Sequence, residues 1–431
     1  MLRLPFQLLC IAWLTTGVCH SHTRPIQNSH LGGFVRDILS VNTGSSSIKI
    51  DVFVSHDSQD TQKKYSVSVE DIGQAENILT LKDSSGTEKA ARTLQECDFA
   101  TATEEALNVL QDFYSLKNIS AVGVRFVHSG PNITQHCIVT NDTINELLAW
   151  EDLDPTHLPA TLTVLTSLQE QLPQVPYVGC FDTVFFAEIP KVAQTIAIPH
   201  AIDDPGIKRY GFHGLSYSYI RDSFRANEGK SATNGRVIMA HLGSGASITA
   251  LKDGKPVDMT MGFTPASGIP MSTRSGNIDP AIGFYLHERY GLDEGQVNEM
   301  LQTHSGLLGI SGFTADMHTL LQQRDHNDRA RLAVDVFCYE ASKAIASLSA
   351  TVGGIDSIIF AGGIGERSAP IREQICTLLQ YLGVRLDDNA NQSNARLISS
   401  SDSQVGVHVI PTDESAMIAN ITKSVCNKEN L

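Results

Sequence analysis

Close cysteine pairs are missing from the sequence. Its eight cysteines are scattered between Cys10 and Cys426, and no two of them form a C-x-x-C pattern. Structural zinc sites and thioredoxin-like redox centres use such pairs, because both sulfurs must reach one ion or one disulfide. We therefore exclude these two classes and expect the thiols to be mostly buried and reduced.

Clusters of basic residues are also missing. The chain has 32 basic against 47 acidic residues, a formal charge of −15, and no run of lysines or arginines offsets it locally. A nucleic acid would meet net repulsion on such a chain, so we expect no nucleic-acid partner. A small phosphate group stays compatible, because backbone amides, a metal ion and a few arginines suffice to bind it.

The common nucleotide fingerprints do not occur. The sequence contains no G-x-x-x-x-G-K-[ST], and its glycine-rich loops do not fit G-x-G-x-x-G. A P-loop fold and a dinucleotide-binding fold are therefore disfavoured, although a nucleotide can still be bound by other glycine loops.

The first 36 residues contain no Asp or Glu and carry an apolar run from Leu4 to Cys19 behind Arg3. A secretory signal fits the short apolar run, and an organellar presequence fits the lack of acidic residues. A retained extension or a misassigned start codon is the alternative. We expect an N-terminal extension here and no stable membrane span in the rest.

The rest of the chain has the length and composition of two soluble globular domains. Alternating apolar residues from Ile48 to Val54 follow the small-residue turn 42–47, which predicts a hairpin with one buried face. The same arrangement returns at 237–251. We therefore expect two mixed α/β domains, each opened by a hairpin, with helices such as 329–351 covering the sheets.

A third glycine loop, 361–366, follows an apolar strand at 355–360 and precedes a helical stretch from about Ala369. Strand, glycine loop and helix in this order bring backbone N–H groups close to a nucleotide. Elsewhere a single arginine, Arg125, stands in an apolar strand-like run, where it needs a partner anion. His213 and Arg274 stand between small residues that leave room for a substrate.

From about Ile38 to Ala419 the chain resembles the acetate kinase family, because ten motifs occur in the same order. They are VNTGSSSIK (41–49), VRFVHSG (124–130), CFDTVF (180–185), RYGFHG (209–214), HLGSGAS (241–247), MGFTP (261–265), TRSGNIDPAI (273–282), SGLLGISG (305–312), AGGIGE (361–366) and IPTDE (410–414).

The resemblance implies an α/β fold of two actin-like (ribonuclease H-like) domains with the active site in the cleft between them, and a homodimer. The expected boundaries are an extension at 1–36, an N-terminal domain at 37–190 plus 411–431, and a C-terminal nucleotide-binding domain at 191–410. The implied reaction transfers a phosphoryl group between ATP and acetate. An enzyme that needs ATP favours the cytoplasm, although residues 1–36 resemble a targeting segment.

Carried over residue by residue, the resemblance makes Asn42 and Glu414 the Mg²⁺ site, with Mn²⁺ as the alternative ion. Arg125 and His157 would bind the substrate. Asp182, His213 and Arg274 would be catalytic, with Asp182 orienting rather than abstracting a proton, since acetate is already ionised near neutral pH. The nucleotide would contact Lys49, His241, Leu242, Gly243, Ser244, Gly245, Asp316, Met317, His318, Gly362, Gly363, Ile364, Gly365 and Glu366.

The match breaks at a few positions. Ser244, Arg367 and His318 differ from the family on the nucleotide side, so ATP and pyrophosphate both stay open as donors. On the other side, Phe186 and Tyr217 stand where the family has histidines. Acetate, propionate and butyrate cannot be told apart from sequence. A nucleotide-binding protein of the same fold without turnover is the third alternative.

Overall fold

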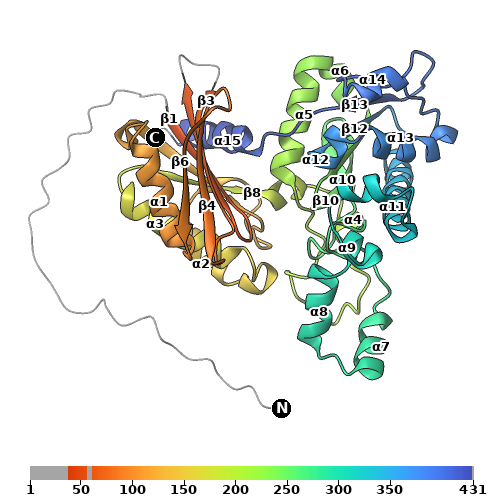
Figure 1. Ribbon diagram of the computed structural model, residues 1–431, viewed down its shortest axis with the longest axis horizontal. Coiled ribbons are helices and arrows are strands. Elements are labelled where there is room, and N and C mark those ends of the chain that lie inside the picture. The colour runs from red at the N-terminus through yellow and green to blue at the C-terminus, as the bar shows by residue number, and fades with distance from the viewer. Residues whose placement is uncertain (1–36, 56–60, 430–431) are drawn as a thin grey trace, which may run out of the picture. The chain divides into compact units, whose positions relative to one another are not determined.

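The computed structural model describes residues 37–55 and 61–429, and the targeting-like segment at 1–36 lies outside them. Within these ranges no helix is both long and apolar enough to cross a membrane. The described secondary structure is built on two separate sheets, with the helices packed on their faces (Figure 1).

The first sheet has eight strands in the order β5-β4-β3-β2-β1-β6-β8-β7. Strands β1 to β5 are antiparallel neighbours, and β6 and β8 continue the sheet parallel to β1. The bounds are β1 (Asp37–Thr43), β2 (Ile48–Ser55), β3 (Thr61–Glu70), β4 (Glu76–Asp83), β5 (Glu88–Gln95), β6 (Ile119–Phe126), β7 (Cys137–Ile138) and β8 (Tyr177–Phe181).

The second sheet has five strands in the order β11-β10-β9-β12-β13. Again two antiparallel pairs, β11 with β10 and β10 with β9, are extended by two parallel strands. The bounds are β9 (Arg236–Leu242), β10 (Ala246–Lys252), β11 (Lys255–Met259), β12 (Ser357–Ala361) and β13 (Gly406–Val409). The five strands match β3-β2-β1-β6-β8 in order and direction, so the predicted repeated hairpin extends to a repeated five-stranded unit.

Helices connect and cover these strands. They are α1 (Phe99–Gln111), α2 (Asn141–Leu148), α3 (Leu158–Gln171), α4 (Lys191–Gln194), α5 (Gly214–Glu228), α6 (Lys230–Thr233), α7 (Ala281–Tyr290), α8 (Glu294–Thr303), α9 (Gly306–Ser311), α10 (Met317–Gln323), α11 (Asp328–Val352), α12 (Gly362–Arg367), α13 (Ala369–Leu378), α14 (Asp388–Gln392) and α15 (Glu414–Lys428), with 3₁₀ turns at Leu116–Asn118, Glu151–Leu153, Asp182–Phe186 and Gln380–Leu382.

The side-chain alternation of the strands decides which helix covers which face. In the first sheet Leu39 and Val122 pack in the core under α1 and α3, while their neighbours Ile38 and Ala121 pack in the core under α15. The two helical layers lie on opposite sides of the strands (Figure 1). In the second sheet α11 and α5 cover opposite faces in the same way.

Helix α5 belongs to both cores. Its Leu215 packs with β6, β8 and α15 residues of the first sheet, whereas Tyr217, Ile220 and Phe224 pack with β9 and β12 of the second. The start of α5 is therefore a point where groups from the two sheets meet.

The long helix predicted at 329–351 is confirmed as α11, which ends on Gly353 in the left-handed conformation (φ 79°). The expected mixed α/β architecture is confirmed as well. The proposed domain boundaries at 190 and 411 stay predictions, because the described residues belong to a single compact unit.

Gly123 lets α15 lie close to β6. A Cβ built there would be 2.1 Å from Thr422 Oγ1 and 2.6 Å from Ile418 Cγ2, both on α15. Since Glu414 is the first residue of α15, this close packing also places the Glu414 carboxylate relative to the ends of β1 and β6.

We expect Gly123→Ala to lower the free energy of unfolding by about 1–3 kcal/mol, because α15 has to move away from β6. The matched control is Gly283→Ala in α7, where the nearest atom to a new Cβ is Val297 Cγ1 at 3.8 Å. That change should be neutral or stabilising by up to about 1 kcal/mol, because alanine favours helix. Urea denaturation of both variants checks this, and equal effects would contradict the packing argument.

Candidate active site

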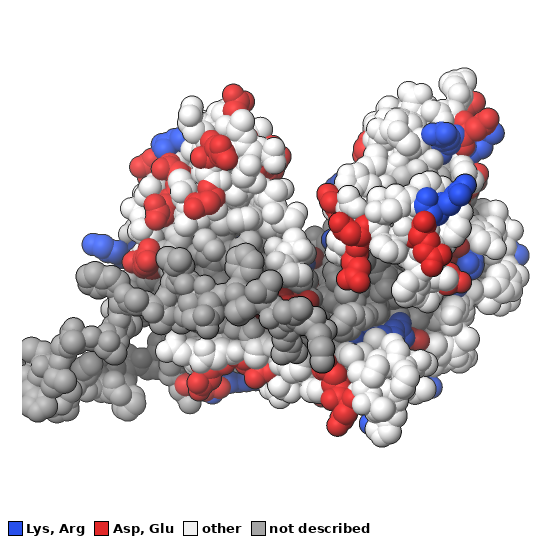
Figure 2. Space-filling view, turned by 90° about the horizontal axis from the view of Figure 1, so that it is seen from below, with Lys and Arg blue, Asp and Glu red and all other residues white. Residues whose placement is uncertain are grey.

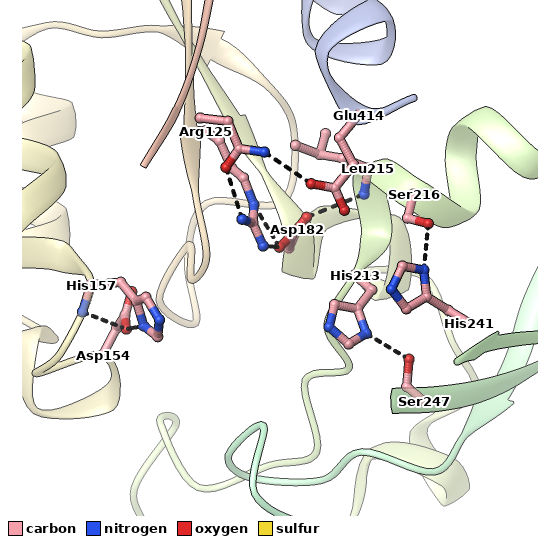
Figure 3. A network of polar contacts seen from close by, with 11 residues as sticks. Arg125, Asp154, His157, Asp182, His213, Leu215, Ser216, His241, Ser247 and Glu414 are labelled. Carbon is pink, nitrogen blue, oxygen red and sulfur yellow. Dashed lines mark hydrogen bonds and ion pairs between the residues drawn. The ribbon is translucent and has the colours of Figure 1, made fainter. Parts of the chain in front are cut away.

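Arg125 lies at the centre of a hydrogen-bond network that joins four elements (Figure 3). Its Nε and Nη2 donate to Asp182 Oδ2 at 3.1 and 2.7 Å, and its Nη1 donates to Asn42 Oδ1 at 2.9 Å. The Asn42 amide in turn donates to Glu414 Oε2 at 3.0 Å. Side chains from β1, β6, the end of β8 and the start of α15 thus act as one unit.

The network contains one cationic side chain, Arg125, and two carboxyl groups, those of Asp182 and Glu414. Arg125 faces two carboxyl groups, and the Asp182 side chain is fully buried. Burial raises the pKa of Asp182, and the neighbouring Glu414 adds to the rise while Arg125 opposes it. For Arg125 burial opposes the charged form, but attraction to Asp182 and Glu414 outweighs it and raises the pKa. The guanidinium therefore stays charged.

Glu414 offers an oxygen to a cation. Its Oε1 has no hydrogen-bond partner within residues 37–55 and 61–429. Although burial works against ionisation, Arg125 and the hydrogen bond from Asn42 lower the pKa of Glu414. No group of three or more His, Cys, Asp or Glu side chains that could hold a metal gathers among the described residues. A hard cation that keeps most of its waters fits such a sparse oxygen site.

His213 is held at the start of α5 by the backbone. It adopts a left-handed conformation (φ 60°) as the residue before the helix, and the next residue, Gly214, has no room for a side chain because a Cβ would lie 1.8 Å from the Asp182 carbonyl oxygen. The Leu215 N–H donates to Asp182 Oδ1 at 3.3 Å. Asp182 therefore positions Arg125 on one side and the start of α5 on the other.

A second histidine stacks on His213. The ring centroids of His213 and His241 are 4.5 Å apart, and Ser216 Oγ lies 2.8 Å from His241 Nδ1 (Figure 3). Burial, together with the charges of Arg125 and Arg274 and with His241, lowers the pKa of His213 well below its usual range. At neutral pH His213 is therefore an uncharged imidazole under the influence of two cationic side chains.

Arg274 is a partly buried cation without a carboxylate partner among the described residues. Its Nη1 lies 3.4 Å from the Pro265 carbonyl oxygen, and burial lowers the pKa of its guanidinium. A Cβ built on Gly245 would lie 3.1 Å from His213 Nε2 and 3.8 Å from Arg274 Nη1. Because Gly245 has no side chain, both groups face one open point, where an anion can approach.

That point borders a pocket of about 1300 Å³. Its walls are the turn between β9 and β10, the loop around Arg274, the start of α10 and the third glycine loop. The lining residues are His213, Gly243, Ser244, Gly245, Ser272, Thr273, Arg274, Ala315, Asp316, Met317, His318, Leu321, Gln322, Gly363, Ile364, Arg367, Ser368 and Pro370.

The third glycine loop forms the short helix α12, and a buried arginine holds it. Arg372 is fully buried, and its five N–H donors bond to the Gly365 and Glu366 carbonyls, to Asn391 twice and to Asn394. Burial lowers the pKa of Arg372 to about 10. Glu366 Oε1 accepts from the N–H groups of Gly362 and Thr412 at 3.0 Å, so it supports the loop from within.

The structure brings most of the sequence-predicted site residues together. Asn42, Arg125, Asp182 and Glu414 share the network, while His213 and Arg274 border the pocket. Of the expected nucleotide contacts, Gly243, Ser244, Gly245, Asp316, Met317, His318, Gly363 and Ile364 line the pocket. The lining does not include five other expected contacts, His241, Leu242, Gly362, Gly365 and Glu366.

Two predicted residues are neither hydrogen-bonded to the Arg125 network nor part of the pocket lining. His157 Nδ1 lies 2.9 Å from Asp154 Oδ1, and this pair has no hydrogen bond to the Arg125 network (Figure 3). The Lys49 side chain, 46% exposed, lies 3.5 Å from Asp51 Oδ2.

Sequence reasoning missed two kinds of residue. The pocket also contains Ser272, Thr273, Ala315, Leu321, Gln322, Ser368 and Pro370, which are ordinary loop and helix residues with no chemical signature. The second kind are the hydroxyl groups that contact the two histidines or each other, those of Ser216, Tyr217 and Ser247. Ser247 closes one of the glycine motifs and Tyr217 is a departure from the family, so both positions carried a signal.

Comparison with known proteins identifies the family of this chain over nearly the whole described range. A family model described as the Acetokinase family matches residues 37–420, nearly all of the described chain. The chain belongs to the acetokinase family.

Other members of the acetokinase family match over almost their full length. An acetate kinase of Bacillus subtilis is 38% identical over 389 residues, which cover 89% of this chain and 97% of the relative. The crystal structure of Porphyromonas gingivalis acetate kinase superimposes with a TM-score of 0.83 at 33% identity, covering 90% of this chain and 99% of that one. A propionate kinase from Francisella tularensis reaches 0.84 at 32% identity, covering 90% and 100%. The two-sheet fold of this chain is thus the fold of solved members of the acetokinase family. The predicted fold class is confirmed.

Removing the positive charge from the network should be costly. We expect Arg125→Met to lower the free energy of unfolding by about 3–5 kcal/mol, because Asp182 is left buried without its partner. Adding Asp182→Asn should recover part of that loss, since the amide is uncharged and can still accept from Leu215. Urea denaturation of the two single variants and the double variant measures this, and a double variant no more stable than Arg125→Met would contradict it.

Proposed function

We propose that the protein is an acetate kinase, which transfers a phosphoryl group directly between ATP and acetate to give acetyl phosphate and ADP. One observation carries the proposal. His213, an uncharged imidazole within the electrostatic influence of Arg125 and Arg274, borders with Arg274 a large pocket lined by glycine loops. In-line transfer spreads charge over three equatorial phosphoryl oxygens, and fixed donors and cations aimed at them lower the barrier.

In this proposal Arg125 binds the carboxylate of acetate, for which a planar guanidinium is suited. Asp182 holds Arg125 through two hydrogen bonds to one carboxylate oxygen, so it orients the guanidinium. Because acetate is already ionised near neutral pH, no base is needed to activate it. Arg274 and His213 contact the phosphoryl oxygens, and His157 contacts the substrate only if it turns from Asp154.

Asn42 and Glu414 are the residues that would hold Mg²⁺, or Mn²⁺ in its place, and Lys49 lies close enough to lower the pKa of Glu414. When bound, the ion neutralises phosphate charge. The chain's own contribution is an oriented carboxylate in a network that has one guanidinium for two carboxyl groups. A homodimer, the domain boundaries at 190 and 411, and a cytoplasmic location belong to the same proposal.

The phosphoryl acceptor and the phosphoryl donor each have an alternative. Propionate or butyrate could replace acetate, because a solved relative of similar likeness is named a propionate kinase and extra methylenes change affinity little. Pyrophosphate could replace ATP, because Arg367 brings an exposed cation to the pocket with no hydrogen bond or ion pair among the described residues.

The proposal is tested by a hydroxamate assay of the full chain with Mg²⁺. Acetate, propionate and butyrate are each paired with ATP and with pyrophosphate. We expect the highest kcat/KM with acetate and ATP. The absence of acyl hydroxamate with every pairing would overturn the kinase assignment in favour of a nucleotide-binding protein without turnover.

Arg367 offers a separate test of donor binding. Its Nη2 lies 2.6 Å from the point where a Cβ on Gly363 would stand, so the guanidinium lies over the third glycine loop. We expect Arg367→Ala to raise the KM for the phosphoryl donor about tenfold or more, as for the loss of a charge-assisted hydrogen bond, with the KM for acetate unchanged. Arg331→Ala, on the exposed face of α11, is the matched control. An unchanged donor KM would contradict the contact.

A further inference from the structure

A chain of hydroxyl groups lies behind His213. The Tyr217 hydroxyl is 2.6 Å from Ser247 Oγ, and Ser247 Oγ is 2.8 Å from His213 Nδ1. Tyr217 is fully buried and Ser247 is 2% exposed. In Figure 3 a dashed line joins a ring nitrogen of His213 to Ser247. Tyr217 lies in α5, His213 directly precedes α5, and Ser247 lies in β10, so the chain of direct contacts joins the two elements.

Aromatic packing keeps the Tyr217 hydroxyl away from other partners. The Tyr217 ring packs against Phe185 and Phe186, with centroids 5.8 and 5.9 Å away. Phe186 and Tyr217 are the two positions where histidines were expected, so the two departures from the family contact each other. Within the described residues, Ser247 is the side chain to which Tyr217 is hydrogen-bonded.

The direction of the hydrogen bonds follows from counting protons. Among the described residues Ser247 is the hydrogen-bond partner of the Tyr217 hydroxyl, so the phenol proton points to Ser247. Ser247 then accepts from Tyr217 and donates its single proton to His213 Nδ1. In the reverse direction the phenol proton would have no acceptor among the described residues, which is costly for a buried donor.

This direction decides where the proton of His213 resides. An uncharged imidazole carries one N–H, and a nitrogen that accepts a hydrogen bond does not carry it. Since Nδ1 accepts from Ser247, the proton is on Nε2. That atom is the one that faces the bare side of Gly245, beside Arg274.

We propose that Tyr217 and Ser247 are positioning residues that hold His213 in its Nε2–H form, as an uncharged donor aimed at the oxygens of the transferred phosphoryl group. The inference rests on the proposed function for the identity of the acceptor. The tautomer itself follows from hydrogen-bond geometry alone. A donor that is uncharged at neutral pH contributes direction, while Arg125 and Arg274 contribute charge.

The test combines kinetics with nitrogen NMR of the histidine-labelled full chain. In the wild type we expect His213 with a protonated Nε2 and an unprotonated Nδ1. Tyr217→Phe removes the donor to Ser247, so Ser247 is free to accept from Nδ1 and the Nδ1–H form should grow. We expect kcat for acetyl phosphate formation to fall about tenfold to a hundredfold, with the KM for acetate within about twofold.

Matched variants separate positioning from folding. Ser247→Ala should reproduce the loss in kcat, and Ser247→Thr, which keeps the hydroxyl, should restore most of it. Tyr177→Phe, in β8, removes another buried tyrosine hydroxyl, one that donates to the Leu172 carbonyl at the end of α3, and should leave kcat and the tautomer unchanged. Melting temperatures confirm that each variant is folded.

A wild-type His213 with the proton on Nδ1 would overturn the proposal, as would a Tyr217→Phe variant with unchanged tautomer and kcat. The NMR signal needs no turnover, so its outcome stands separately from the hydroxamate assay. If the assay failed while the Nε2–H form was observed, the proposed function would be wrong and the tautomer assignment right.

Discussion

The buried ion pair between Arg125 and Asp182 is the interaction on which the site depends. A charged pair out of water is tolerated only when its remaining donors and acceptors are satisfied. Here Asn42 Oδ1 accepts the third hydrogen bond of the Arg125 guanidinium, and the Leu215 N–H donates to the second oxygen of the Asp182 carboxylate. The Asn42 amide also donates to Glu414. Those contacts join β1, β6, β8, α5 and α15, so the ion pair ties the chemistry to both sheets.

The positive charge that acts on His213 contrasts with the negative charge of the whole chain. Acidic and basic side chains are interspersed over the face shown in Figure 2, and the chain as a whole carries −15. Near His213, in contrast, the charges of two arginines act together, and the histidines are uncharged because burial favours their neutral forms. A small anion is therefore attracted at short range, where buried charges are little screened, without a basic surface that would also attract polyanions.

Glycines serve this site mainly by letting backbone come close. Gly214 brings α5 against Asp182, Gly123 brings α15 against β6, and Gly245 leaves the space that His213 and Arg274 share. In each case the missing side chain places a functional group that belongs to another residue. These glycines become informative only with the structure, because a tight turn can require glycine for backbone reasons whether or not a ligand is near.

The sequence by itself determined the strands of the two hairpins, the strand before the third glycine loop, the long helix α11 and the ordered motifs, because alternation, glycine stops and close-spaced motifs are local properties of the chain. It also singled out Arg125, since an arginine in an apolar strand needs an anion, although it did not by itself name Asp182. Only the tertiary structure decided that His157 pairs with Asp154, that Lys49 pairs with Asp51, and that Tyr217 and Ser247 stand behind His213. The physical reason is that hydrogen-bond partners and pocket walls are set by packing between residues far apart in the chain, which no local pattern records.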